Sequence, residues 1–170
     1  MLLTMSAFAQ QESGAATAAC GPRKASFEVK LDETQHAIAE PEAGKALVYF
    51  IQDVGPVNCL GSCFQTKIGL DGGWVGAVQH NSYFSASVEP GEHHVCASPQ
   101  MHFVSATSEK YASIRLAFSH FKAEAGKVYY FRTRSFGSQN QGLFDMDVID
   151  GDQAKYLIAS YPLSVSHLKP

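Results

Sequence analysis

Two adjacent histidines and a nearby cysteine are the residues of this chain that come closest to a metal-binding pattern. They are His93, His94 and Cys96, at the end of a stretch that reads as short strands joined by tight turns. Adjacent residues of a strand point to opposite faces, so His94 and Cys96 share a face that His93 does not. Two ligands fall short of the three or four that the protein supplies in a typical zinc site. We therefore expect no bound metal, with His93 inward or at an edge and His94 facing solvent.

Other histidines could complete such a site, although the sequence does not place them in space: His80, His102 and His120.

Patterns typical of catalytic sites are missing from the sequence. No Gly-x-Ser-x-Gly elbow occurs, and Gly72-Gly73 opens no helix as a phosphate-binding loop would. Asp145 and Asp147 lie on one face of an expected strand, which suits acid–base work or calcium binding. The same pattern is commoner on the solvent-exposed face of an edge strand, and we adopt that interpretation. We predict no catalytic residue and no cofactor.

The four cysteines indicate two disulfides if the chain is exported, and four cysteines allow three pairings. Cys59 and Cys63 are close in sequence with Gly61 between them, so a local bridge is sterically reasonable. That pairing leaves Cys20 with Cys96, a bridge that would stabilise the fold by roughly 4 kcal/mol. We favour this arrangement and leave the other two open. A redox role for Cys59 and Cys63 would need a two-residue spacing that is absent.

The N-terminus indicates export. The first nine residues are mostly apolar, and Ala7-Phe8-Ala9 matches an A-x-A cleavage site. Ala18-Ala19-Cys20-Gly21 also resembles the end of a lipobox, with Thr17 where leucine is usual, so lipidation of Cys20 is a second possibility. We expect residues 1–24 to be a signal-peptide remnant and flexible leader. Nothing after residue 9 is long and apolar enough to span a bilayer.

Composition and pattern favour a single β-domain over residues 25–170. The chain has 170 residues, 45% hydrophobic and 17% charged, with a net charge of -3 and no run of Lys or Arg to grip nucleic acid. Residues 45–52 are apolar on both faces, which predicts a central strand. About nine short strands favour a two-sheet antiparallel sandwich. Asp150 can cap one short C-terminal helix, with Gln153 as its partner.

Two turns predict hairpins. Asp71-Gly72 between alternating segments is a strong hairpin signal, because both central residues of a type I′ turn need positive φ. Pro90-Gly91 separates two further segments, and a two-residue loop would set Val88 opposite His93. That register places His93 and Val95 inward, with His94 and Cys96 outward. A slip of one residue would reverse every assignment.

Five segments in this order resemble the bacterial domain-of-unknown-function 2846 (DUF2846) family. They are GKALVYFIQ (44–52), IGLDGGWVG (68–76), YFSASVEPGEHHVC (83–96), AEAGKVYYFRTR (123–134) and the tail DQAKYLIASYPLS. The pattern also looks similar to the Ig-like or carboxypeptidase-regulatory type of sandwich. The resemblance implies a small exported or envelope-associated β-domain with no established activity. It transfers no catalytic residue, and residues 59–63 are less typical of the pattern.

The sequence thus favours a non-enzymatic exported β-sandwich, periplasmic or extracellular, that serves as a binding or structural module of the cell envelope. An envelope protein or a glycan would be its partner. The alternative is a metal-dependent or hydrolytic enzyme with a site near His94. The face that carries Arg132 and Arg134 is either a binding face or packed by another layer. The loops that we expect to make contact lie around Trp74, at Cys59 to Cys63, and at Ser135 to Gly142.

Overall fold

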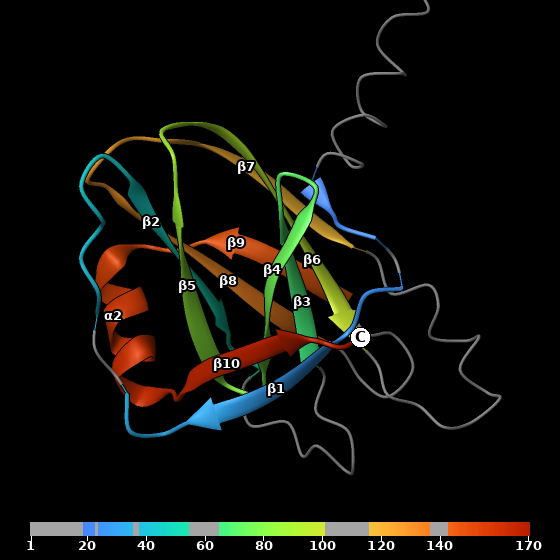
Figure 1. Ribbon diagram of the computed structural model, residues 1–170. Helices are drawn as coiled ribbons and strands as arrows, with labels where there is room; N and C mark the ends of the chain where they lie inside the picture. Colours follow the sequence, from blue (N-terminus) through green and yellow to red (C-terminus); the bar gives the residue numbers. More distant parts are fainter. Residues whose placement is uncertain (1–18, 23, 36–37, 55–64, 101–115, 137–142) are drawn as a thin grey trace, which may run out of the picture.

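The computed structural model describes residues 19–22, 24–35, 38–54, 65–100, 116–136 and 143–170. Two β-sheets pack face to face, and one helix lies on the outer side of the larger sheet (Figure 1). The six-stranded sheet has the order β1-β10-β5-β2-β8-β9 and the four-stranded sheet the order β4-β3-β6-β7. The prediction of a mainly β two-sheet sandwich with a helix near the C-terminus is confirmed. The elements are β1 (Phe27–Asp32), β2 (Ala46–Gln52), β3 (Gln65–Leu70), β4 (Gly73–Gln79), β5 (Ser82–Val88), β6 (Gly91–Gln100), β7 (Ala117–Ala123), β8 (Val128–Phe136), β9 (Leu143–Val148), α2 (Gly151–Ser160) and β10 (Leu163–Leu168).

Strand β2 is the centre of the molecule, and all seven of its residues are buried. Val48 and Phe50 point into the core between the two sheets, whereas Tyr49 and Ile51 point to the opposite face. Helix α2 covers that second face with Ala154, Leu157 and Ile158. Burial on both sides explains why the segment is apolar throughout, as the sequence indicated.

The β3–β4 hairpin forms at the predicted turn. Asp71 has φ 50° and Gly72 has φ 85°, the two positive values that a type I′ turn requires. Helix α2 also begins as predicted, because the Asp150 carboxylate accepts hydrogen bonds from the backbone N–H groups of Asp152 and Gln153. Local turn and capping chemistry was therefore a sound guide.

The predicted hairpin at Pro90-Gly91 is wrong. β5 pairs with β2 along its whole length in the six-stranded sheet, and β6 pairs with β3 and β7 in the other sheet. The turn thus carries the chain across the sandwich from one sheet to the other. Val88 and Val95 nevertheless both face the core, as predicted. Alternation determines the face of a strand but not its hydrogen-bonded neighbour.

The sheets also differ from the prediction in direction and strand number. β2 pairs parallel with β8 and β10 pairs parallel with β5, so the sandwich is not purely antiparallel. Ten strands lie in the described residues, because β10 follows the helix that we expected to be the last element. Its inward residues are serines: the Ser164 hydroxyl donates to the Ala77 carbonyl, and the Ser166 hydroxyl accepts from the Ala77 N–H. Because polar residues face inward here, the alternation of apolar and polar residues did not indicate a strand.

Candidate functional site

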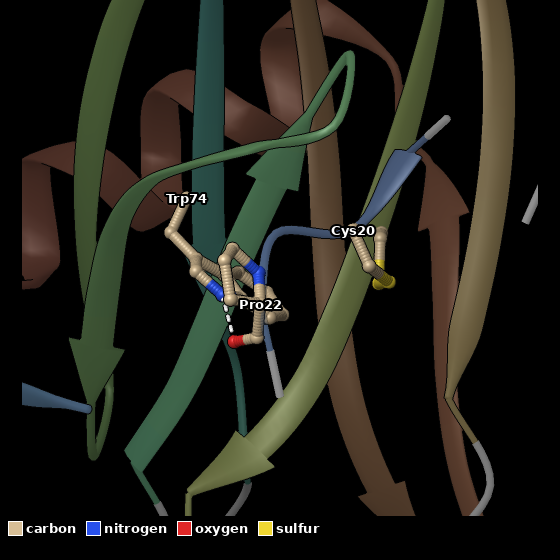
Figure 2. Close-up of a disulfide and its surroundings, with 4 residues drawn as sticks. Cys20, Pro22 and Trp74 are labelled. Carbon is tan, nitrogen blue, oxygen red and sulfur yellow. Dashed lines mark hydrogen bonds between the residues drawn. A yellow bond between two sulfur atoms is a disulfide. The ribbon is translucent and has the colours of Figure 1, made fainter. Parts of the chain in front are cut away.

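A segment ahead of the sandwich lies across the outer face of the four-stranded sheet. We call this segment, residues 19–22 and 24–26, the strap. A disulfide joins Cys20 of the strap to Cys96 in β6, with the two Cα atoms 5.3 Å apart (Figure 2). This is the longer of the two bridges that the sequence favours. Cys59 and Cys63 lie outside the described residues. Cys96 points outward, as expected, but the strap buries it completely.

Trp74 of β4 holds the strap by a hydrogen bond and by close packing. Its indole Nε1–H donates to the Pro22 carbonyl at 2.8 Å (Figure 2). Gly21 packs so closely on the indole that a Cβ there would overlap the ring. A Cβ on Gly69 would lie 2.6 Å from the Ala19 carbonyl oxygen. Glycine is thus required at both positions, and Trp74 contacts the chain itself rather than standing free in a loop.

Lys67 of β3 is a buried lysine beneath the strap. Its Nζ donates to the Ala25 carbonyl at 2.7 Å and lies 4.4 Å from the centre of the Trp74 ring, a cation–π distance. Burial lowers the pKa of Lys67. The lysine therefore links the strap to the hairpin through one carbonyl and one aromatic face.

A row of glutamine side chains fastens the point where the strap enters β1. The Gln100 side-chain amide accepts from the Phe27 N–H and donates to the Phe27 carbonyl, both at 2.7 Å. Gln100 also donates to Gln65, which donates to Gln79 at 2.6 Å. The row crosses β6, β3 and β4 and ends on the backbone of β1. The sequence gives the positions of these glutamines, but whether they align in one row depends on the register between the strands.

A charged cluster lies on the outer face of the six-stranded sheet, near the end of α2. Arg132 of β8 makes a two-point ion pair with Asp147 of β9, at 2.7 and 3.2 Å, and lies 3.7 Å from Asp53. Tyr161, which ends α2, donates its hydroxyl to Asp53 at 3.0 Å. Burial, and then the hydrogen bond to Asp53, raise the pKa of Tyr161 to about 12. Arg134 adds a contact to Asp147 at 3.3 Å.

This cluster links β8 and β9 to the residues that directly follow β2 and α2. Because Asp147 is paired with two arginines, it differs from Asp145, which is exposed and accepts the backbone N–H of Met146. The prediction that both carboxylates lie on a solvent-exposed face is therefore correct for Asp145 but not for Asp147. Both are on the edge strand β9, as expected. The face of β8 that carries Arg132 is packed beside α2 rather than left open.

His93 joins two turns. Its Nδ1–H donates to the Asp71 carboxylate at 2.6 Å and its Nε2–H donates to the Glu89 carbonyl at 2.7 Å, so the doubly protonated ring satisfies both acceptors. Burial alone would lower the pKa of His93, but the bonds to Asp71 and Glu89 outweigh burial and raise it. The second oxygen of Asp71 accepts the His94 N–H at 2.9 Å, which ties both histidines to the β3–β4 turn.

His94 lies on the opposite face from His93, beside His120 of β7, with the two ring centres 6.3 Å apart. His80 is at the β4–β5 turn with φ 54°, and His102 lies outside the described residues. Within the described part of the chain, no three His, Cys, Asp or Glu side chains are grouped closely enough to hold a metal ion.

Comparison with known proteins gives one finding. A family model described as "Protein of unknown function (DUF2846)" matches residues 42–144. No curated protein and no solved structure gives a significant match. Among the described residues, no helix is both long and apolar enough to cross a membrane. The matched range includes Trp74, Cys96 and Arg132 but not Cys20.

Proposed function

The chain belongs to the DUF2846 family of proteins of unknown function, and from that premise we propose that it is an exported, non-enzymatic β-sandwich that serves as a binding or structural module of the cell envelope. The observation that carries the proposal is the bridge between Cys20 and Cys96. Disulfides persist in oxidising compartments such as the periplasm and the extracellular space.

The position of the bridge agrees with the suggested cleavage site. Cutting after Ala9 would leave Cys20 and the whole strap in the mature protein, so the bridge could form after export. A lipid at Cys20 would need the sulfur that the disulfide uses. The disulfide-bonded form is therefore a protein without a lipid at that residue.

The distribution of polar side chains supports a module rather than an enzyme. A catalytic site needs several polar groups that converge on one concave pocket. Here Lys67 lies under the strap, Arg132 is on the outer face of the other sheet, and His93 joins two turns. Each is engaged with partners of its own. These side chains stabilise three separate junctions of the fold.

The first experiment tests export. The full chain would be expressed with its own N-terminus in a bacterium, and the periplasmic fraction analysed by intact-mass spectrometry. We expect a species that begins after Ala9 and carries a bridge between Cys20 and Cys96. A cytoplasmic protein that retains Met1 and has free thiols would contradict export. An added lipid mass at Cys20 would favour the anchored form.

The second experiment tests whether the protein acts as a binding module. Purified, disulfide-bonded protein would be cross-linked to native envelope fractions and the products identified. We expect one envelope protein or glycan to be captured from independent preparations. A variant with Gly and Ser in place of residues 137–142 provides the comparison for one expected contact loop. Turnover of a hydrolase substrate that is lost in His94→Ala would contradict a non-enzymatic role.

A further inference from the structure

His94 and His120 form a cross-strand pair on the outer face of the four-stranded sheet. They are direct partners in the antiparallel register of β6 and β7, strands that run side by side (Figure 1). Side chains at directly opposed positions point to the same face, with Cβ atoms about 4.5–5.5 Å apart. The two imidazole rings have centres 6.3 Å apart and planes inclined by 39°.

The two rings are available to a ligand, unlike that of His93. Both nitrogens of His93 are already engaged by Asp71 and the Glu89 carbonyl. Within the described residues, the rings of His94 and His120 contact one another and take part in no hydrogen bond or ion pair. His120 is exposed and His94 is half-buried. This arrangement leaves imidazole nitrogens on the solvent side of the sheet.

The described residues around the pair fix the strand that carries His94. Cys96, two residues after His94 on the same face, is fixed by the disulfide to Cys20. Among the described residues, the strap contacts β3 and β4 through Gly69 and Trp74, and its disulfide reaches β6 at Cys96. Phe118, which is opposite Cys96 on β7, remains 46% exposed. A rigid backbone beside an open surface lowers the entropy lost when a ligand is bound.

We propose that His94 and His120 together bind one divalent ion of the late first-row transition metals, with solvent completing its coordination. Zinc and its neighbours bind imidazole nitrogen at about 2.0–2.1 Å, so two nitrogens on one ion are at most about 4.2 Å apart. The 6.3 Å in the structure separates the ring centres, and side-chain rotation that turns a nitrogen of each ring toward the other makes the distance between the two nitrogens shorter than that.

Ligand type determines which ions fit the pair. Imidazole suits Cu²⁺, Ni²⁺ and Zn²⁺, whereas Mg²⁺ and Ca²⁺ prefer oxygen ligands. The order of affinity should place Cu²⁺ first, with Ni²⁺ and Zn²⁺ weaker. This inference does not depend on export or on the proposed envelope role, because it rests on the geometry of β6 and β7 alone.

Metal titration of the full, disulfide-bonded chain without a histidine tag tests the proposal. We expect one Cu²⁺ per chain, and an electron paramagnetic resonance spectrum with coupling to two imidazole nitrogens. His94→Gln and His120→Gln should each lower Cu²⁺ affinity at least tenfold, because binding through the second ring is then no longer intramolecular. His167→Gln, on an exposed histidine of β10 in the other sheet, should leave the affinity unchanged.

A second measurement needs no variant. In nuclear magnetic resonance spectra of the wild-type chain, substoichiometric Cu²⁺ should first broaden signals of residues 92–96 and 118–122. Equal affinity in the wild type and the His94→Gln/His120→Gln double variant would overturn the proposal. Broadening centred on His93 or His167 would overturn it as well.

Discussion

Removal of the Cys20–Cys96 bridge, by changing both residues to alanine, should destabilise the protein mainly through its unfolded state. The bridge joins residues 76 apart in sequence. For a closed loop of that length, the chain-entropy relation gives about 15 cal/mol/K, or roughly 4.5 kcal/mol at 25 °C. In the folded state, Trp74 and Lys67 still bind the carbonyls of the strap, so the contacts there are largely kept.

Urea unfolding followed by fluorescence and circular dichroism measures this loss. With a urea dependence of about 2 kcal/mol/M, a change of roughly 4.5 kcal/mol lowers the midpoint by about 2 M. The dependence on urea should also become steeper, because an unfolded chain without the cross-link exposes more surface. The Cys59→Ala/Cys63→Ala variant is the matched control. Its short loop predicts a loss of about 2 kcal/mol if that bridge forms.

The comparison between the two double variants decides whether the reasoning holds. The long bridge should cost at least twice as much as the short one. A midpoint within about 0.3 M of the wild type after removal of the long bridge, in protein whose oxidised form was verified by mass, would refute the entropic argument. An equal loss in both variants would also refute it, because loop length would then not matter.

Three further changes test separate junctions by urea unfolding. The raised pKa of His93 means that its pairing with Asp71 stabilises the fold most below the unfolded-state pKa of about 6.5. The stability advantage of the wild type over His93→Gln should therefore shrink as pH rises from 6 to 8; an advantage that grows would contradict this. Gly69→Ala should cost about 1–3 kcal/mol, because its Cβ has no room beneath the strap; no loss would argue against that close approach. Arg132→Met should cost about 2–3 kcal/mol, because Asp147 loses its two-point partner; a neutral result would show that the ion pair adds no stability.

Much of the local structure could be predicted from the sequence. Strand alternation correctly placed Val88 and Val95 in the core, and the Asp71-Gly72 turn and the Asp150 cap formed as expected. These features depend on residues within a few positions of each other. The partner of β5 could not be predicted in this way, because the backbone N–H and C=O groups of any strand can pair with those of any other.

The candidate site was less predictable than the fold. Cys20 with Cys96 was one of three possible pairings, and nothing local to Trp74 indicated that residues 19–22 would cover it. The ion pair between Arg132 and Asp147 likewise depends on the register of β8 against β9. Long-range contacts of this kind depend on which strands are neighbours and on their register.

By itself, the sequence determined which face of most strands is buried, where the tight turns lie and which residue caps the helix, because short-range geometry controls each of these. Only the tertiary structure decided that β5 and β6 belong to different sheets, that a strap closes over Trp74 and Lys67, and that His94 lies beside His120. The physical reason is that these features depend on contacts between segments far apart in the sequence. In this structure, β2 is covered on both faces and its backbone pairs with β5 on one side and β8 on the other, and no short stretch of sequence specifies those neighbours.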